Sequence, residues 1–186
     1  MRFDPDKHHR RSIRLKGYDY SQAGAYFVTI CTKDRGCLFG EIIDGEMVLN
    51  PFGEVVQACW DDLPRHYPHV ELDAFVIMPN HLHGIIIIRR GEAFVSSNAS
   101  PLHPHGTQPG SLGAIIQNFK SVSTRKINRS TRNPGNKSWQ RNYYEHVIRN
   151  EKSLNTIRRY IIENPLHWTD DPENPANITQ GNAPCH

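Results

Sequence analysis

Runs of apolar residues with a period of two, or with no break, predict strands, and apolar residues three or four positions apart predict helices between them. The expected strands are 26–32, 38–43, 47–49, 75–78 and 85–88, and the stretch 139–148 leaves room for another. The expected helices cover about 51–63, the residues from 111 to a turn at 130–137, and about 150–163. Helices lying on one face of a mainly antiparallel sheet predict an α+β fold of ferredoxin-like type.

Turn and capping residues mark where these elements begin and end. Asp44-Gly45 lies between two short strands and is a strong hairpin signal. Pro79-Asn80 predicts a tight turn between the later pair of apolar runs. Asn50 precedes a proline, which is typical of a helix N-cap followed by proline in the first turn.

The length of 186 residues fits one domain with flanking segments. Residues 1–16 are expected to be a basic arm, 17–168 the folded domain, and 169–186 a polar tail that is loose from Thr169 onward. Residues 91–110 are rich in Gly, Pro, Ser and His, without periodicity, and are expected to form a long loop.

Charge is distributed unevenly although the net charge is only +3. Residues 111–150 carry eight Lys or Arg against one Glu. Such a segment suits a polyanion, and phosphate backbones are the commonest partner of that kind. A solvated helix face is the alternative explanation.

The cysteines and the apolar runs together predict where in the cell the protein is found. The four cysteines are scattered without a CxxC pair, and the first residues contain no apolar signal-peptide core. No apolar run is long enough to span a bilayer. We therefore expect reduced thiols in a cytoplasmic protein with no membrane partner.

His81-Leu82-His83 lies between two apolar runs and is the most informative motif. Alternate side chains of a strand point to one face, so His81 and His83 are expected to face outward together while Leu82 packs inward. Two neighbouring imidazoles can bind a metal ion. Two exposed histidines without a function are the alternative.

The last expected helix carries polar side chains that could complete such a site. Tyr160 and Asn164 are four residues apart and project from one helical face. The Asn164 side-chain oxygen could be a third ligand for Mg²⁺ or Mn²⁺, and tyrosine can act as a covalent nucleophile. Equally, Tyr160 could border the core and Asn164 could end the helix.

Tyr143 and Tyr144 follow Arg141 in a basic stretch. Aromatic side chains among positive charges suit stacking on unpaired bases. Packing against the core is the alternative for both tyrosines.

The segment 74–85 resembles the His-hydrophobe-His (HUH) signature of the single-tyrosine transposases. Further blocks are similar to that family in order and spacing, at 26–30, 116–121, 139–141 and 159–165. The last block resembles in particular the REP-associated tyrosine transposases, which are linked to repetitive extragenic palindromes in bacteria. The resemblance covers roughly residues 10–168.

This resemblance implies an HUH endonuclease fold with a catalytic domain at 17–168. It implies that His81 and His83 are metal ligands, with Asn164 as the third where mobile relatives usually have glutamine. It makes Tyr160 the nucleophile that attacks a single-stranded DNA phosphodiester, which leaves a 5′-phosphotyrosyl link and a free 3′-hydroxyl.

The implied partner is single-stranded DNA that carries palindromic hairpins beside the cleavage site. The expected DNA contacts are Lys120, Arg125, Lys126, Arg141 and Arg14. The resemblance favours a monomer over a homodimer, associated with the bacterial nucleoid, that either transposes DNA or processes palindromes. The alternatives are a catalytically inactive palindrome-binding protein of the same fold and a replication or conjugation relaxase.

Overall fold

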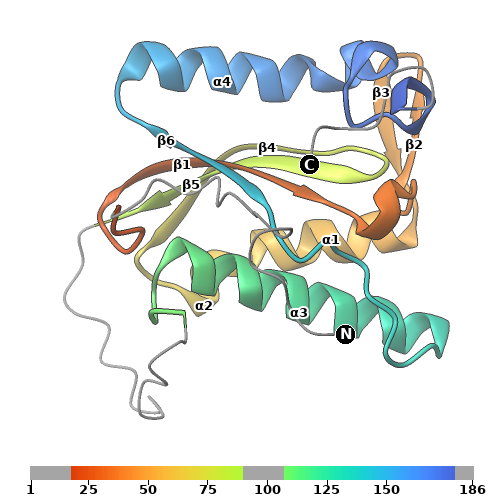
Figure 1. The fold of residues 1–186 in the computed structure, drawn as a ribbon, viewed down its shortest axis with the longest axis horizontal. Helices are drawn as coiled ribbons and strands as arrows, with labels where there is room; N and C mark the ends of the chain where they lie inside the picture. The colour runs from red at the N-terminus through yellow and green to blue at the C-terminus, as the bar shows by residue number, and fades with distance from the viewer. Residues whose placement is uncertain (1–17, 90–106, 179–186) are drawn as a thin grey trace, which may run out of the picture.

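The computed structural model describes residues 18–89 and 107–178, which form an α+β structure (Figure 1). The predicted basic arm 1–16 with Arg14, most of the stretch 91–110 and the end of the tail lie outside the described residues. Within the described ranges, no helix is long and apolar enough to cross a bilayer.

A four-stranded antiparallel sheet forms the centre of the fold. Its strands are β1 (Gly24–Cys31), β4 (Val70–Ile77), β5 (His81–Ile88) and β6 (Tyr144–Ile148), in the order β4-β5-β1-β6. Helical crossovers separate β1 from β4 and β5 from β6, which gives βαββαβ connectivity. The predicted α+β fold of ferredoxin-like type is therefore confirmed.

A separate two-stranded hairpin follows the first strand and a short 3₁₀ turn, η1 (Lys33–Arg35). Its strands are β2 (Gly40–Ile43) and β3 (Glu46–Leu49). Asp44 and Gly45 between them have φ angles of 52° and 79°. Two positive φ angles in succession are what a two-residue turn of type I′ requires, so the predicted Asp-Gly hairpin is confirmed.

The helices lie on both faces of the sheet. They are α1 (Pro51–Asp61), α2 (Leu63–His66), α3 (Leu112–Thr131) and α4 (Glu151–Glu163). The crossover helices α1 and α3 cover one face, whereas α4 lies across the other (Figure 1). The prediction that all helices share one face is wrong for α4, because its apolar residues pack on a second, smaller core around Phe27 and Ile85.

Two predicted N-caps fix where α1 and α3 begin. The side-chain oxygen of Asn50 accepts hydrogen bonds from the backbone N–H groups of Phe52 and Gly53 at 2.9 and 3.0 Å. The Ser111 hydroxyl accepts one from the N–H of Ala114 at 3.4 Å. These bonds satisfy N–H groups that have no partner inside the helix.

The larger core lies between the sheet and the helices α1 and α3. Trp60 stacks on Phe75 with ring centroids 4.6 Å apart and meets Phe119 edge-on at 5.5 Å. A Cβ atom on Gly84 would come within 2.4 Å of the Trp60 ring. Glycine at position 84 therefore leaves the room that the indole occupies, one residue after His83.

The chain beyond α4 folds back instead of leaving the domain. A 3₁₀ helix, η2 (Asn164–Asp170), and a short helix, α5 (Pro175–Ile178), follow it. The Asn177 amide donates to the carbonyl oxygens of Thr169 and Asp171 at 2.8 and 2.9 Å. The prediction of a loose segment from Thr169 is therefore wrong for residues 169–178.

Candidate metal and tyrosine site

His81 and His83 begin β5, directly after the turn that joins it to β4, and they point to the same face as predicted. That face is covered, and the two residues are 0% and 3% exposed. The Trp168 ring lies 6.1 Å from His81, and the Tyr160 ring 5.1 Å from His83. The prediction of an outward-facing pair is wrong, because α4 and the segment after it cover the face.

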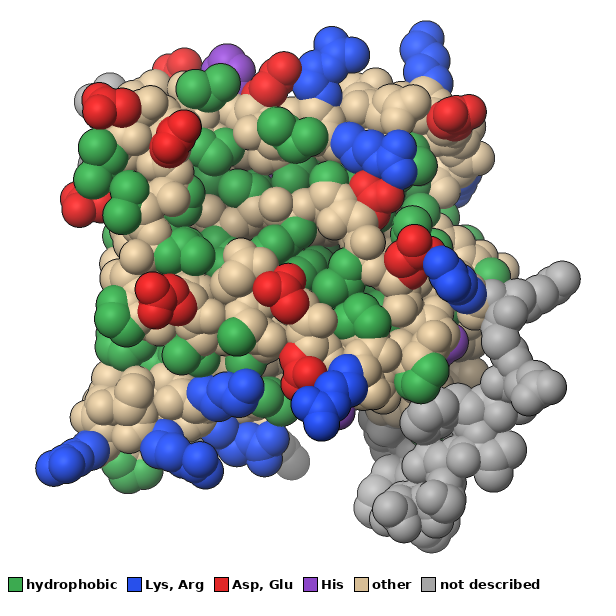
Figure 2. All heavy atoms as spheres, turned by 180° about the vertical axis from the view of Figure 1, so that it is seen from behind, with side chains coloured by type: hydrophobic (Ala, Val, Ile, Leu, Met, Phe, Trp, Pro, Cys, Tyr) green, Lys and Arg blue, Asp and Glu red, His purple; other side chains and the backbone are tan. Residues whose placement is uncertain are grey.

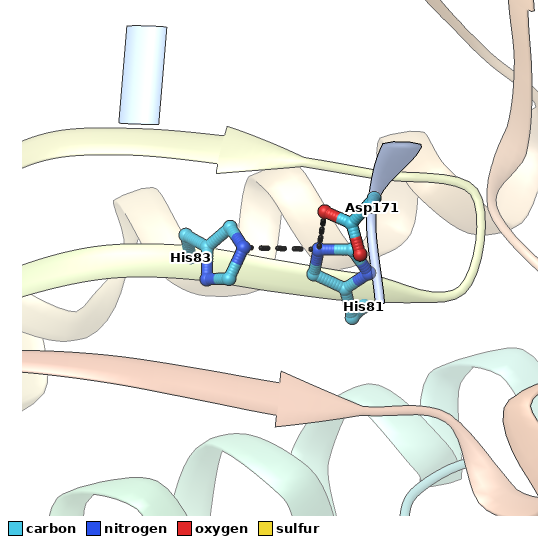
Figure 3. Close-up of side chains that lie close together, drawn as sticks. All are labelled: His81, His83 and Asp171. Atoms are coloured by element: carbon cyan, nitrogen blue, oxygen red, sulfur yellow. Dashed lines mark hydrogen bonds and ion pairs between the residues drawn. The ribbon is translucent and has the colours of Figure 1, made fainter. Parts of the chain in front are cut away.

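The two imidazoles face each other through their Nε2 atoms, which are 3.0 Å apart (Figure 3). Each Nδ1 atom is engaged on its other side. His81 Nδ1 lies 2.9 Å from the Asn80 side-chain oxygen, and His83 Nδ1 lies 2.8 Å from the Thr29 hydroxyl. Both rings are therefore held from behind, with Nε2 directed into the site.

Asn80 determines the tautomer of His81. Its amide NH₂ group donates to the backbone carbonyls of Arg35 and Glu173 at 3.0 and 2.7 Å. The amide oxygen must then face His81, and an oxygen can only accept a hydrogen bond. The network therefore assigns the proton of His81 to Nδ1 and a lone pair to Nε2.

Thr29 leaves His83 a choice, because a hydroxyl both donates and accepts. When His83 Nδ1–H donates to Thr29, the Nε2 lone pairs of both histidines point into the same small space. Two lone pairs repel each other, and a cation between them removes that repulsion. In the other tautomer His83 Nε2–H donates to His81 Nε2, so the pair also has a hydrogen-bonded state without a cation.

Asp171 joins the two histidines as a third potential ligand (Figure 3). Its Oδ2 lies 3.9 Å from His81 Nε2, and the ligand atoms of the three residues all lie within 4.8 Å of one another. The other carboxylate oxygen accepts a hydrogen bond from the Glu173 N–H at 2.6 Å. Sequence reasoning missed Asp171, since it lies in the segment that was predicted to be loose.

Asn164, the predicted third ligand, lies in the same site. It is buried, and its side-chain oxygen has no hydrogen-bond partner among the described residues. Its side chain contacts Tyr160 and Asp171: burial raises the pKa of both groups, and a hydrogen bond from Asn164 partly offsets that rise in each. A buried oxygen without a partner is costly to keep, and a bound cation would satisfy it.

Tyr160 extends from α4 to the edge of this cluster. Its hydroxyl lies 3.3 Å from His83 Nε2, while the residue is 46% exposed. Burial of its inner part and the nearby charge of Asp171 raise the pKa of its hydroxyl. The hydroxyl is therefore protonated at neutral pH and lies between the buried histidines and solvent.

The ionisation of the cluster fits a divalent cation. Burial lowers the pKa of His81 to about 2 and that of His83 to about 3, so both rings are neutral and keep lone pairs at physiological pH. Burial raises the pKa of Asp171, and the hydrogen bonds from the Glu173 N–H and from Asn164 only partly offset that rise. Two imidazole nitrogens, a carboxylate and an unpartnered amide oxygen form a reasonable ligand set for such an ion.

Two of the predicted DNA contacts lie on the opposite side of the sheet from this cluster. Arg125 and Lys126 are exposed on α3, which covers the opposite face of the sheet from Tyr160. Figure 2 shows Lys and Arg side chains gathered at the lower left, where the C-terminal end of α3 lies. Arg141 is exposed in the loop before β6, and Lys120 donates to backbone carbonyls of that loop.

Comparisons with known proteins agree with the fold. No family model matches the chain. An uncharacterized protein of Haemophilus influenzae is 46% identical over 169 residues, which cover 88% of this chain and 92% of that protein. A second protein of that organism, provisionally named a REP-associated tyrosine transposase, is 26% identical over 148 residues. This match covers 80% of this chain and 73% of that protein.

Among solved structures, a REP-associated tyrosine transposase bound to a REP hairpin matches with a TM-score of 0.57. The match has 19% sequence identity and covers 82% of this chain and 73% of that chain. The fold is thus the one found in HUH transposases of the REP-associated kind. The chain belongs to one family with the uncharacterized H. influenzae protein, and it is distantly similar to the REP-associated tyrosine transposases.

Proposed function

We propose that this protein cuts single-stranded DNA beside palindromic hairpins and joins itself to the cut end through Tyr160. The observation that carries the proposal is the position of the Tyr160 hydroxyl, 3.3 Å from His83 Nε2 at the open side of the cluster of His81, His83 and Asp171. A nucleophile accessible to solvent, beside a buried cation site, is the arrangement that metal-assisted phosphoryl transfer needs.

In the proposed reaction the Tyr160 oxygen attacks the phosphorus of a DNA phosphodiester. The new bond joins tyrosine to the 5′-phosphate, and the bond from phosphorus to the 3′ oxygen breaks. Tyr160 gives up its proton, and the departing oxygen takes one up to become a 3′-hydroxyl. The bond energy is kept in the phosphotyrosyl link, so the same 3′-hydroxyl, or another, can reverse the step and exchange strands.

The neighbouring side chains position the phosphate and the nucleophile. His81, His83 and Asp171 would hold Mg²⁺ or Mn²⁺, with Asn164 as a further oxygen donor, and the two nitrogen ligands favour Mn²⁺ of the two. When bound, this ion would polarise a phosphate oxygen and orient the leaving group. The packing of Tyr160 against Phe27, with ring centroids 6.1 Å apart, holds the hydroxyl toward the cluster.

The proposed partner is DNA with a hairpin and an unpaired flank. The distant relative whose fold this chain shares was solved with a REP hairpin. The exposed Arg125, Lys126 and Arg141 supply positive charge that suits phosphate contacts without sequence readout. Binding that rests on such contacts should fall steeply as salt rises.

The test is a covalent-adduct assay on single-stranded hairpin DNA with Mn²⁺ or Mg²⁺. The wild-type protein should give a DNA-linked band on a denaturing protein gel, absent for Tyr160→Phe and absent with a chelator. Tyr67→Phe is the matched control and should keep the band, because Tyr67 packs against the larger core on the opposite side of the sheet and its hydroxyl accepts a hydrogen bond from the Asn118 amide at 2.9 Å. Intact hairpin binding with no adduct from the wild type would instead indicate a palindrome-binding protein of the same fold.

A further inference from the structure

Two adjacent tyrosines point to opposite faces of the sheet. Tyr143 packs against the larger core, and the Lys120 ammonium lies 5.3 Å from the centre of its ring. Tyr144 begins β6 and is paired in register with Thr29, whose side chain contacts His83 on the α4 face. Packing therefore accounts for Tyr143, and Tyr144 is left on the face that carries the site.

Tyr144 and Tyr160 flank one buried aromatic ring. The ring centroid of Phe27 lies 6.2 Å from that of Tyr144 and 6.1 Å from that of Tyr160, with an edge-on geometry in both pairs. Phe27 is buried, whereas both tyrosines are about half exposed. The two tyrosines are therefore on the same face of the sheet, and each contacts the ring of Phe27.

The surface around Tyr144 lies between exposed basic residues and the cluster of His81, His83 and Asp171. β6 is at the edge of the four-stranded sheet, on the side where the Lys120 ammonium holds the loop 140–142. Arg141 is exposed in that loop. A strand that contacts the basic residues of α3 on one face can reach Tyr160 on the other by passing around this edge.

We propose that Tyr144 is the stacking platform for an unpaired base of the DNA strand near the phosphate that Tyr160 attacks. The inference rests on the proposed function and deepens it, because it assigns a binding subsite for single-stranded DNA. Every base has a π-face, so stacking there positions the strand without selecting a sequence. Tyr144 is in this role a positioning residue and takes no part in bond formation.

The experiment measures binding in a Tyr160→Phe background, so the DNA stays intact. The probe is a hairpin oligonucleotide with 2-aminopurine in its unpaired flank, whose fluorescence is quenched by stacking. In this background the further substitution Tyr144→Ala should weaken binding roughly 5- to 150-fold and remove the quenching, as for other base–aromatic contacts. Tyr144→Phe should change little, and Val48→Ala, at an exposed strand position of the separate hairpin, should change nothing.

Tyr144→Leu separates stacking from apolar contact, since leucine keeps apolar volume but has no π-face. It should behave like Tyr144→Ala, and behaviour like Tyr144→Phe would overturn the inference. Unchanged binding by Tyr144→Ala would overturn it too, even if the wild type forms the covalent adduct. A loss of binding by Tyr144→Ala in a protein that forms no adduct would uphold the stacking subsite and reject the proposed cleavage.

Discussion

On the face of the sheet that α1 and α3 cover, β1 and β5 present Val28, Ile30, Leu82 and Ile86, all fully buried in the larger core. On the opposite face the same two strands present Thr29, His81 and His83, which are also buried, beneath α4 and η2. Strand alternation thus places an apolar core and a polar cluster back to back.

The two faces differ in what their burial accomplishes. Apolar side chains stabilise the fold in proportion to the area they remove from water, whereas buried polar groups need partners before they cease to cost free energy. Asn80 and Thr29 supply those partners to the histidines. We infer that the α1–α3 face supports the fold and leaves the α4 face free to keep a ligand set, and substitutions should separate the two roles.

The largest effect on stability should come from the apolar face. Trp60→Ala removes a ring that is 1% exposed and packed between Phe75 and Phe119, so the free energy of unfolding should fall by about 3–5 kcal/mol. Denaturant unfolding followed by circular dichroism measures it. Tyr160→Phe, on the other face, should cost less than about 1 kcal/mol. Equal losses would contradict the separation of roles.

Metal binding should stabilise the protein through the residues on the α4 face of the sheet alone. At a Mn²⁺ concentration 100 times the Kd, the free energy of unfolding should rise by about 2.7 kcal/mol in the wild type. His83→Ala should lose this increment, and Trp60→Ala should keep it despite its lower stability. An increment that survives in His83→Ala would place the ion elsewhere.

The same measurement decides between the two oxygen donors. Asp171→Asn and Asn164→Ala each remove one of them, and the larger loss of the Mn²⁺ increment identifies the stronger ligand. We expect it from Asp171, because its buried carboxylate has a raised pKa and gains most from a nearby cation.

Asn80 should tune metal affinity without contacting the ion. Asn80→Ala leaves His81 Nδ1 without its acceptor, and loss of such a supporting residue typically weakens metal binding by about 10- to 100-fold. Quenching of tryptophan fluorescence by Mn²⁺ is a direct readout, since Trp168 lies 6.1 Å from His81. A ¹⁵N NMR comparison of His81 in the two proteins should show its proton on Nδ1 in the wild type and no longer on Nδ1 in Asn80→Ala. An unchanged tautomer would contradict the assigned role.

Local patterns were sufficient to find part of this site. His81 and His83 were predicted as a pair because alternation along a strand is a property of the strand itself. The sequence did not predict that the two histidines are buried, because an amphipathic helix such as α4 can pack on either face of a sheet. The spacing of apolar residues after Ser111 correctly predicted the helix α3, which carries part of the charge run at 111–150, but which face α3 covers depends on the crossover connections.

Asp171 shows more clearly which part of the site could not be predicted from the sequence. It reaches the histidines because η2 follows α4 and turns the chain back, and contacts such as that of the Asn80 amide with the Glu173 carbonyl hold it there. These contacts join residues that are 93 positions apart. No spacing in the sequence predicts these contacts. Tyr160 and Asn164 are different, because their separation of four residues in itself predicts that they lie on one helical face.

The smallest effect should come from the ion pair that ties α4 to the sheet. Two guanidinium nitrogens of Arg158 donate to the two carboxylate oxygens of Asp73 on β4, at 2.8 and 2.6 Å, and this holds the pKa of Asp73 below its usual 3.8. A lowered pKa in the folded state means that stability is present above pH 3.8 and is lost as the pH falls through the folded pKa. Because the pair is partly exposed, Asp73→Asn should lower the melting temperature by only about 2–3 °C at pH 7.

That difference between Asp73→Asn and wild type should shrink as the pH falls below 3.8 and vanish once it is under the lowered pKa of Asp73 in the folded protein, where the wild-type carboxyl is protonated. Glu71→Gln is the control, because its ion pair with Arg89 joins two exposed residues of which neither belongs to α4. If α4 is held mainly by Ile161 and the small core, both variants should form the covalent adduct normally. A loss of adduct in Asp73→Asn alone would mean that this one ion pair, and not the apolar contacts, sets the position of Tyr160.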